Sequence, residues 1–493
     1  MLARFCEKPY LHLVKKTVEM SIVTLQLGQC GNQIGRELFD LIVEDATKLN
    51  SRFLCKELTT RSCTEYEEES LARFFTREND DILNARAVSI DMESKVISQT
   101  LSEASKSGTW RYPKGQQFSQ KRGSGNNWAH GFSEHGPKSI DKVLDLVQRE
   151  VEKCDRLDGF LTLLSLAGGT GSGVGAFVTN SLRDFYPNSF IVNNVVWPYS
   201  MGEVIVQNYN ATLTLAQLYK SSDAIIIVEN DKLQKICSKL LNLKHISFRD
   251  INKVVSHKLG SMLQPMKLFR AGQSETELGK TLSVSSLLAD IVEQLCPHPD
   301  YKLLSLRSIP QMAEKSMAYS TYNWSGLLKH LRQMLIADAS MEEGIDWEVR
   351  LPADGISDHH SQASSSGTQS NPPLRQNFNK SIANRVVMRG KDVTYADPSA
   401  FADPRLYVDW MPSYDLGSIT CHLRPFNNYE KSVTLLSNSQ THVGPLSKVV
   451  GKAWTMFASR AYVHQYLRFG ISEDAFVDSF ACLEQVVKNY YSL

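Results

Sequence analysis

The residues best suited to chemistry are five glycines within eight residues, from Gly168 to Gly175, with Thr170 and Ser172 among them. Glycine lets a backbone approach a ligand closely and adopt positive φ, and the two hydroxyls add hydrogen-bond donors. A short apolar stretch precedes the run at 160–166, and apolar side chains recur at helical spacing after it, over 174–185. A helix that begins in such a loop presents free N–H groups and the positive end of its dipole. The pattern therefore predicts a phosphate-binding loop, without identifying the nucleotide.

The loop differs from two common phosphate-binding motifs. No lysine follows the glycines, as a P-loop requires, and the glycines are too dense for the G-x-G-x-x-G dinucleotide motif. The alternative is an ordinary tight turn between a strand and a helix. Each glycine costs about 0.5–1 kcal/mol in an ordered element, and a turn needs fewer than five, so the phosphate site is favoured.

Two carboxylates follow another predicted strand. Residues 87–90 form a short apolar stretch, and Asp91 and Glu93 come directly after it. Carboxylates beside phosphates hold Mg²⁺, which keeps several of its water ligands. The pair therefore predicts a magnesium site next to the phosphates, and a solvated strand end remains the alternative.

Polar side chains also follow the other predicted strands. Residues 21–27 are a strand, and a second glycine-bearing loop, 28–35, carries Gln29 and Asn32 before a helix expected at 37–49. Ligands of parallel α/β sheets bind at the carboxyl ends of the strands. The further candidates at such positions, for a phosphate, a ribose or a base edge, are Asn126, Glu203, Gln207, Asn210 and Asn230.

The elements that would position these residues alternate between strand and helix through residue 230. This order predicts an α/β fold with a doubly wound, mostly parallel sheet, although residues 50–86 are expected to be irregular. The expected divisions are an extension (1–19), a nucleotide-binding domain (20–247), a core helix (248–264), an α+β domain (265–445) with a flexible insertion (352–378), and C-terminal helices (446–493).

Composition bounds the class of protein. A chain of 493 residues with 42% hydrophobic and 22% charged residues is typical of a soluble globular protein of two to three domains. The net charge of +1 predicts no nucleic-acid partner, and the lack of any apolar run near 18 residues predicts no membrane span. Nine cysteines without a C-x-x-C pair favour a reducing compartment over disulfides or zinc. Residues 1–19 lack a secretory h-region and are interpreted as a dispensable extension, a transit-like segment being the alternative.

Several of these motifs together resemble those of tubulins. They are Gly28–Gly35, Gly125–Ala129, Gly168–Gly173, Tyr209–Leu213, Cys296–Pro299 and Ala461–Tyr466. The resemblance extends from Met20 to the C-terminus. The end of the chain, 486–493, has no acidic tail, and the 352–378 insertion is foreign to alpha- and beta-tubulin, so the chain resembles a more divergent member of the family.

The resemblance implies a tubulin fold that binds GTP and Mg²⁺, with a GTP-binding domain, an intermediate domain and a C-terminal helical layer. The positions that match the GTP site are Gln29, Cys30, Asp91, Asn126, Ser165, Gly168, Gly169, Thr170, Gly171, Ser172, Gly173, Glu203, Asn230, Phe248 and Asn252, and those that match the metal region are Asp91 and Glu93. By this resemblance Glu203 takes a ribose position, Asn230 and Asn252 read the guanine edge, and Phe248 stacks on the base. Gln207 stands where tubulins commonly have glutamate, which weakens that ribose contact.

The resemblance also implies that a neighbouring subunit completes the nucleotide site. Asp290, seven residues before Pro297, matches the catalytic glutamate of alpha-tubulin, and Glu293 is a second candidate. A solvated helix acid is the alternative for this position. The implied function is assembly-coupled GTP hydrolysis beside other tubulins in centrioles and ciliary basal bodies of the cytoplasm, with the nucleus as a further location. The alternative is a GTP-binding structural or capping protein without turnover. A metabolic enzyme ranks last, because no His or Cys cluster supplies a base.

Overall fold

The structure is a computed structural model that describes residues 20–48, 60–77, 82–202, 204–274, 277–278, 281, 283–284, 286–317, 320–352, 378–412 and 417–493. Most of the insertion predicted at 352–378, the extension 1–19 and Glu203 therefore lie outside the described residues. No helix within the described ranges has both the length and the apolarity that crossing a bilayer requires.

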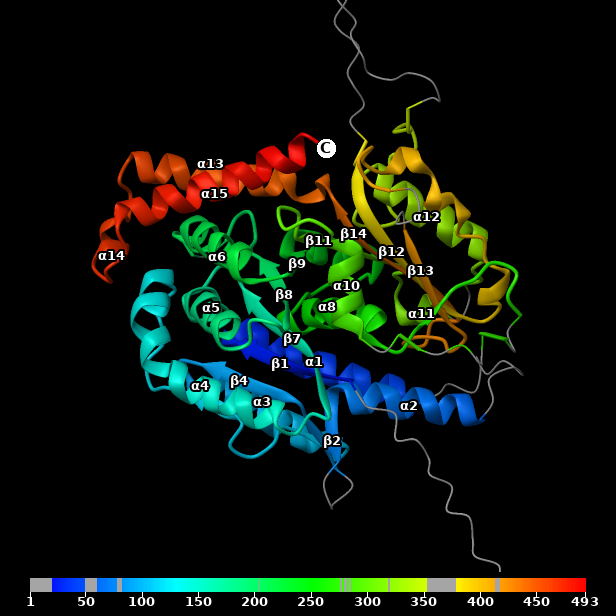
Figure 1. Ribbon diagram of the computed structural model, residues 1–493, viewed down its shortest axis with the longest axis horizontal. Coiled ribbons are helices and arrows are strands. Elements are labelled where there is room, and N and C mark those ends of the chain that lie inside the picture. Colours follow the sequence, from blue (N-terminus) through cyan, green and yellow to red (C-terminus); the bar gives the residue numbers. More distant parts are fainter. Residues whose placement is uncertain are drawn as a thin grey trace, which may run out of the picture.

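An eleven-stranded sheet runs through the described part of the molecule, in the order β10-β13-β12-β14-β11-β9-β8-β7-β1-β4-β6 (Figure 1). Six neighbouring strands pair in parallel and form what we call the parallel half. They are β1 (Met20–Leu27), β4 (Ala87–Asp91), β6 (Gln117–Ser119), β7 (Arg156–Ser165), β8 (Phe190–Trp197) and β9 (Ala224–Glu229). Their central strands are nearly continuous buried runs, because helices cover both faces.

Helices on opposite faces make the parallel half doubly wound, as predicted. One face carries α1 (Gly28–Thr47), α3 (Ser94–Lys106) and α8 (Phe248–Leu263), which contact one another through α1. The other face carries α4 (Gly136–Val151), α5 (Gly175–Phe185) and α6 (Gln207–Ser221). The C-terminal helices α13 (Val443–Ala458) and α15 (Glu473–Tyr491), with the short α14 (His464–Leu467) between them, pack on α6 (Figure 1).

The sheet continues from β9 into a second region that we call the mixed half. Strand β11 (Leu303–Ile309) is parallel to β9 but antiparallel to β14 (Lys431–Ser439). The remaining strands are β12 (Ser381–Gly390), β13 (Ser418–His422) and the two-residue β10 (Lys267–Leu268). Helix α12 (Trp324–Ile336) packs over them around a separate apolar cluster. This is the predicted α+β arrangement, and the predicted fold class is confirmed.

The predicted core helix is α8, which ends at Leu263. Ser247 caps its first turn, since its hydroxyl accepts from the Asp250 N–H while the Asp250 carboxylate accepts from the Ser247 N–H at 2.9 Å. The remaining short helices are α7 (Asn230–Lys235), α10 (Leu287–Leu295) and α11 (Glu314–Met317), with π-helical turns η2 (His130–His135), η3 (Thr170–Val174) and η4 (Ile236–Leu240). Helix α8 contacts α1 and α7 in the parallel half and β11 and β14 in the mixed half, so it joins the two halves.

Two predictions of secondary structure are wrong. The first is the loop expected at 28–35, because α1 begins at Gly28 itself. A Cβ at Gly31 would lie 2.0 Å from the Leu163 carbonyl oxygen, and one at Gly35 would lie 2.2 Å from the Gln26 side chain. These two glycines therefore allow the helix to pack closely on the sheet, and they do not make a loop.

The second error concerns residues 50–86, which were expected to be irregular. They include α2 (Thr60–Phe74), β2 (Phe75–Arg77) and β3 (Leu83–Ala85), and the two strands form a small sheet with β5 (Trp110–Arg111). The segment is rich in charged residues, but α2 also has an apolar face, on which Tyr66, Leu71 and Phe74 are buried. Tertiary packing of this face outweighs a composition that is weakly helical.

Candidate functional site

The candidate site is the edge of the parallel half where five strands end. The register pairs Ile90 with Leu27, Gln26 with Leu163, Ser165 with Val196, and Trp197 with Glu229. The carboxyl ends of β4, β1, β7, β8 and β9 are therefore level. At a strand spacing of about 4.8 Å, these five ends span about 19 Å. Residues far apart in sequence, from Asp91 to Asn230, thus lie along one edge of the sheet, which we call the crevice because parallel α/β sheets bind their ligands at this edge.

The glycine run lies at the middle of this edge. It turns after β7 and enters the π-helical turn η3, which continues into α5. The Ser165 hydroxyl accepts from the Ala167 N–H at 3.3 Å, and the Ser172 hydroxyl donates to the Gly168 carbonyl. Gly168 and Thr170 are partly exposed, whereas Gly171, Ser172 and Gly173 are buried. The exposed first part of the loop, at a helix N-terminus, is therefore the surface that an anion can reach.

Two segments from other parts of the chain, the turn at 123–127 and the start of α1 at Gly28, pack closely against this loop. A Cβ at Gly169 would lie 2.7 Å from the Ser124 Cβ and 2.8 Å from the Asn127 carbonyl oxygen. A Cβ at Gly28, whose φ is +71°, would lie 2.8 Å from the Gly171 nitrogen. The contacts are too close for any larger residue, so these glycines build the cradle by close backbone approach.

Hydroxyl and amide groups complete the cradle. The Ser124 and Thr170 hydroxyls lie 3.2 Å apart. The Asn126 side-chain oxygen lies 3.7 Å from the position that a Cβ on Gly168 would occupy, so the Asn126 amide sits over the glycine loop. The structure thus brings Asn126 and the loop from Ser165 to Gly173 together at one place.

Asn210 does not face the crevice, which corrects the expectation that it reads a ribose or a base. Its side chain is 0% exposed. The amide nitrogen donates to the carbonyls of Asn126 at 2.8 Å and Ala167 at 2.7 Å. The amide oxygen accepts from the Trp128 N–H at 3.0 Å and from the Tyr466 hydroxyl at 2.6 Å. Asn210 therefore holds two cradle loops in place, with its amide fully used.

The C-terminal turn supports the same loops, a role that sequence reasoning missed. Besides the Tyr466 contact, the Asn127 amide donates to the Gln465 carbonyl at 3.2 Å. The Tyr209 hydroxyl donates to the Ala461 carbonyl at 3.0 Å. The only sequence signal was that 209–213 and 461–466 both match tubulin motifs, which did not reveal that they touch.

Two other polar residues are structural. The Gln207 amide donates to the Tyr199 carbonyl at 2.9 Å, so the residue expected near the ribose is engaged within the protein. Asn32 is buried and donates to the carbonyls of Gly28 at 2.9 Å and Ile90 at 3.2 Å. It therefore ties the start of α1 to the end of β4 and does not face a ligand.

Asp91 and Glu93 lie across β1 from the glycine loop. Asp91 is buried, its carboxylate accepts from the Met92 N–H at 2.7 Å, and burial raises its pKa to about 6. Glu93 is exposed and lies against Gly123. No group of three or more His, Cys, Asp or Glu side chains in the described ranges could hold a metal. Two carboxylates fit Mg²⁺ bound mainly by phosphates and water, and do not make a cage formed by protein alone.

The other end of the crevice combines one exposed ring with amides. Phe248, the first residue of α8, is 64% exposed, Asn252 one turn later is buried, and Asn230 is half-buried at the start of α7. The ion pair from Arg249 Nε to Glu37 Oε1, at 3.0 Å, holds the start of α8 against α1. An aromatic face beside amide groups suits a nucleobase, which has an apolar face and a polar edge.

Gln29 and Cys30 begin α1 in the centre of the same edge. Gln29 is exposed, whereas Cys30 is half-buried. Burial raises the pKa of the Cys30 thiol to about 12, so at neutral pH it is a protonated thiol and no nucleophile. Gln29 can donate to a ligand in the crevice, and Cys30 can only pack against one.

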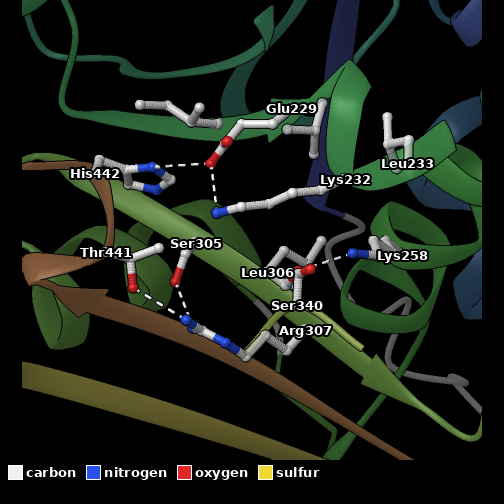
Figure 2. A pocket seen from close by; sticks show the side chains of 12 residues that line it. Glu229, Lys232, Leu233, Lys258, Ser305, Leu306, Arg307, Ser340, Thr441 and His442 are labelled. Atoms are coloured by element: carbon white, nitrogen blue, oxygen red, sulfur yellow. Dashed lines mark hydrogen bonds and ion pairs between the residues drawn. The ribbon is translucent and has the colours of Figure 1, made fainter. Parts of the chain in front are cut away.

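A small polar pocket lies beside the segment that carries Asn230, and contacts among the residues that line it hold this segment in place (Figure 2). Glu229 Oε1 at the end of β9 lies 2.7 Å from Lys232 Nζ and 3.9 Å from His442 Nδ1. Burial lowers the pKa of His442 to about 3, and the neutral ring donates to the Leu304 carbonyl at 3.2 Å. The cavity is about 30 Å³. That space holds one or two waters, so this pocket is not the nucleotide site.

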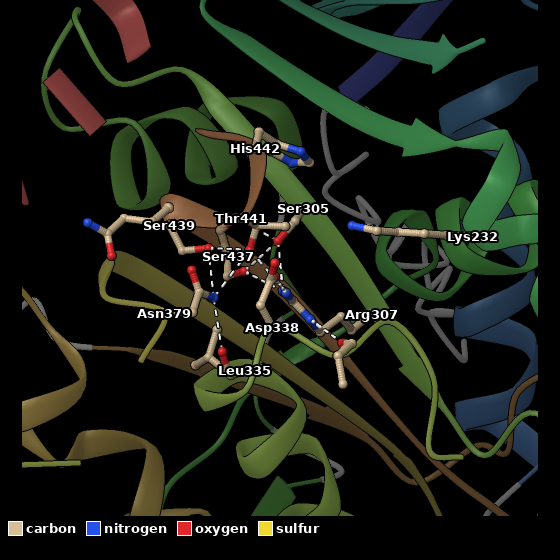
Figure 3. A network of polar contacts seen from close by, with 12 residues as sticks. Lys232, Ser305, Arg307, Leu335, Asp338, Asn379, Ser437, Ser439, Thr441 and His442 are labelled. Carbon is tan, nitrogen blue, oxygen red and sulfur yellow. Dashed lines mark hydrogen bonds and ion pairs between the residues drawn. The ribbon is translucent and has the colours of Figure 1, made fainter. Parts of the chain in front are cut away.

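The pocket shares part of its lining, Ser305, Arg307 and Thr441, with a larger polar network (Figure 3). Arg307 of β11 is buried, and its guanidinium donates to Asp338 at 2.6 Å, Ser305 at 2.8 Å and Thr441 at 3.0 Å. These partners come from β11 itself, from the segment after α12 and from the segment after β14. The network therefore fixes the mixed half beneath the Asn230 end of the crevice.

Asp290 lies at the opposite edge of the sheet. Helix α10 packs against the start of β7, where Asp158 accepts from the Ser286 hydroxyl at 2.7 Å and from the Leu288 N–H at 3.0 Å. Asp158 precedes Ser165 by seven residues of strand, or about 23 Å. Asp290 is half-buried, and burial raises its pKa, while Glu293 is exposed. Neither acid can reach the crevice of its own chain.

The fold and the crevice define a class of nucleotide-binding protein, a parallel α/β sheet with a glycine cradle at its carboxyl edge. Residues 21–238 match the family model described as "Tubulin/FtsZ family, GTPase domain". With the full-length relatives below, this shows that the chain belongs to the tubulin family, and membership of a GTPase-domain family implies that it binds GTP.

Within the family the chain is similar to delta-tubulins. It is 51% identical to the tubulin delta chain of Canis lupus familiaris over 96% of this chain and all of the canine chain. The human (Homo sapiens) tubulin delta chain is 50% identical over the same shares. The tubulin beta chain of Cicer arietinum is 26% identical over 95% of this chain and 94% of its own length. The prediction of a tubulin distinct from alpha and beta is confirmed.

Proposed function

We propose that this chain is a GTP-binding, delta-tubulin-like cytoskeletal subunit that acts in the assembly of centriolar and basal-body microtubules and in cilium formation. The observation that carries the proposal is the closely packed glycine cradle, which is aligned along one sheet edge with Asp91 and Asn230. It is supported by the 51% identity to tubulin delta chains over nearly the whole chain. Centrioles and ciliary basal bodies in the cytoplasm are the proposed location, with the nucleus as a further location.

In this proposal the ligand residues follow the order of the crevice. Gln29, Cys30, Asn126, Ser165 and the loop from Gly168 to Gly173 surround the phosphates. Asp91 and Glu93 serve a phosphate-bound Mg²⁺, which would supply charge neutralisation for the phosphates. Phe248 stacks on the guanine, Asn230 and Asn252 read its edge, and Glu203 takes the ribose.

GTP hydrolysis, if the chain performs it, belongs to an assembled state. Asp290 lies on α10, which packs on β7 at Asp158, and about 23 Å of strand separates Asp158 from the cradle end of β7, so Asp290 can only act on the nucleotide of a longitudinal neighbour. There it would position the attacking water, and backbone donors of the cradle would stabilise the phosphoryl charge. The proposed partners are therefore other tubulins, longitudinal and lateral, without nucleic acid or membrane.

One observation favours the second candidate, a GTP-binding structural or capping protein without turnover. Asp290 is half-buried, and the Arg385 guanidinium donates to its backbone carbonyl at 3.3 Å. The side chain of an aspartate is one methylene shorter than that of the glutamate in alpha-tubulin. Because Asp290 is also half-buried, its carboxylate extends less far from the surface toward a neighbouring subunit. Glu293, one turn further along α10, is exposed and is the other candidate.

The test of the proposal is nucleotide-dependent thermal stability of the full chain. A ligand at about 1,000 times its Kd stabilises the fold by roughly 4 kcal/mol. GTP with Mg²⁺ should raise the melting temperature, and ATP should not.

Thr170→Val should reduce the increase in melting temperature caused by GTP, because a hydrogen bond to a charged group is worth about 1.5–3 kcal/mol. Thr47→Val, at the far end of α1 where the hydroxyl donates to the Val43 carbonyl at 2.7 Å, is the control for stability. Equal shifts with GTP and ATP would reject the assignment.

A further inference from the structure

An open groove lies on the outer face of the mixed half, remote from the proposed nucleotide crevice. It has a volume of about 670 Å³, within the range of ligand-binding clefts. One wall is α12, and the opposite wall is formed by the 3₁₀ turns η5 (Val393–Tyr395), η6 (Ser399–Ala402) and η7 (Pro404–Leu406). Helix α12 packs on β11 and β14, whereas the glycine cradle follows β7 (Figure 1). None of the residues assigned to GTP lines this groove.

Two exposed aromatic rings line the groove. Trp347 is 46% exposed and Tyr395 is 81% exposed. By contrast, Trp324 on the floor is buried, and its indole N–H donates to the Lys391 carbonyl at 3.0 Å. Aromatic side chains with a wet polar end are enriched at binding surfaces, where they provide a large contact area at low entropic cost. The two rings offer a place for an apolar side chain of a partner.

The charge of the lining is strongly asymmetric. Four cations, Lys329, Arg332, Arg350 and Arg405, line the groove together with one carboxylate, Asp397. The ammonium of Lys329 lies 5.5 Å from the centre of the Trp347 ring.

Two of these cations are held in fixed positions. Asp403 accepts from Arg332 at 2.7 Å and from Arg405 at 2.9 Å, so a single carboxylate orients two guanidinium groups at the rim. A pair of arginines that shares one carboxylate keeps a net positive charge. The groove is therefore preorganised to bind several anionic groups that follow one another along an extended segment.

We propose that this groove binds an acidic peptide segment that carries an aromatic or other apolar side chain. Guanidinium groups match the geometry of carboxylates, and the exposed rings take the apolar side chain. A nucleic acid fits less well, because it needs a long basic surface to neutralise successive phosphates, and the net charge of the chain is only +1. The occupant is thus a protein partner with an acidic segment.

The test uses the full chain with GTP and Mg²⁺ and a fluorescein-labelled polyglutamate peptide with one central phenylalanine. Fluorescence anisotropy should show saturable binding that weakens as salt rises. Lys329→Glu combined with Arg350→Glu should weaken binding by about tenfold or more. Lys448→Glu with Lys452→Glu, two exposed lysines of α13, makes the same change of net charge and should have little effect. Trp347→Ala should weaken binding, and Trp347→Phe should restore most of it.

Each other outcome overturns the proposal. Equal weakening by the two double variants would show attraction to net charge alone. Equal affinity for polyglutamate without phenylalanine would remove the aromatic site. Tighter binding of a single-stranded DNA oligonucleotide at the same salt would assign the surface to nucleic acid, and dimers of the chain without peptide would assign it to a second copy. Absence of saturable peptide binding by a chain that GTP still stabilises would reject the groove and leave the GTP assignment intact.

Discussion

The buried Asn210 amide joins the glycine cradle to the turn between the C-terminal helices, next to the contact of Asn127 with the Gln465 carbonyl. Asn210 contacts the backbone of two cradle loops on one side and the Tyr466 hydroxyl on the other. Because its amide is already fully used, any movement of the C-terminal turn changes the support of the loops. In the proposed GTP site Asn210 and Tyr466 would therefore be positioning residues, with an effect on GTP binding that is measurable apart from stability.

We expect Tyr466→Phe to weaken GTP binding by roughly fivefold, since it removes one hydrogen bond to Asn210 worth about 1 kcal/mol. The matched control is Tyr407→Phe, which removes a buried hydrogen bond to the Phe401 carbonyl, at 2.7 Å, in the mixed half and none at the cradle. Both variants should lower the melting temperature by similar amounts, and only Tyr466→Phe should change the Kd for GTP in calorimetry. An equal change of Kd in both would contradict this role for Asn210.

Asp91 is the residue on which the magnesium assignment depends most. Asp91→Asn should abolish the tightening of GTP binding by Mg²⁺, because an amide is a much weaker ligand for a hard cation than a carboxylate. In EDTA the variant and the wild type should bind GTP about equally. The comparison is calorimetric titration with and without Mg²⁺, with Asp141→Asn on the exposed side of α4 as the control. A variant that retains the full Mg²⁺ effect would show that the cation is held elsewhere.

At the scale of elements, the junction between β9, β11 and the segment after β14 is built from buried polar groups. His442 is held neutral between Glu229 and the Leu304 carbonyl, and Arg307 satisfies its guanidinium within the next network. The Arg307 guanidinium is fully hydrogen-bonded, whereas His442 Nδ1 is buried without a hydrogen bond to any described residue, so a charge on this ring is costly at the junction. The junction should therefore respond to pH.

The sign of that response follows from His442. Its pKa is about 3 in the folded chain, against 6.5 ordinarily, because burial disfavours the charged ring. Between about pH 3 and pH 6.5 the unfolded chain binds one more proton than the folded chain. The contribution of the neutral His442 ring to the free energy of unfolding is therefore fully present above pH 6.5 and decreases as the pH falls. From pH 6.5 to pH 5 the loss is about 1–2 kcal/mol. Urea unfolding at both pH values should show a smaller loss in His442→Asn.

The exposed His245 provides the control for this measurement. His245→Asn should keep the wild-type difference between the two pH values. Burial also lowers the pKa of His257, to about 4, so His257 contributes a loss of stability at low pH in every variant. The quantity to compare is therefore the change in the free energy of unfolding between the two pH values, for each variant against the wild type. A wild-type change in His442→Asn would mean that the junction admits the charged ring.

At the scale of the whole molecule, the cradle and Asp290 lie at opposite edges of one sheet. Asp290→Ala should leave GTP binding by the monomer unchanged, and turnover by the monomer should be slow with or without the substitution. In an assembly where a longitudinal neighbour presents its nucleotide to α10, the variant should hold GTP longer. The measurement is GTP turnover in reconstituted assemblies of wild-type and variant subunits, together with monomer binding.

The outcomes of this experiment separate the two proposed functions. Loss of monomer binding would make Asp290 structural. Unchanged turnover in the assembly would favour a structural protein without hydrolysis and leave Glu293 as the candidate, to be tested by Glu293→Ala. Loss of turnover only in the assembly would support hydrolysis completed by a neighbouring subunit.

Local features could be read from the amino-acid sequence. The strands at 21–27 and 160–166, the glycine run at 168–175 and the core helix at 248–264 have patterns that depend on neighbouring residues along the chain. The parallel order also followed, since alternating strands and helices leave few topologies. The family resemblance came from short motifs of the same kind.

Only the tertiary structure decided which polar groups are available to a ligand. Asn210, Gln207 and Asn32 have the same side-chain chemistry as Asn126 and Gln29, yet the first three are engaged with backbone carbonyls of distant or neighbouring segments. The glycines at 28–35 have the local pattern of a loop, although Gly31 and Gly35 lie within α1, where close packing requires them. The distance between Asp290 and the cradle likewise depends on where α10 packs. Hydrogen-bond partners and close contacts are set by residues far along the chain, and no local pattern records them.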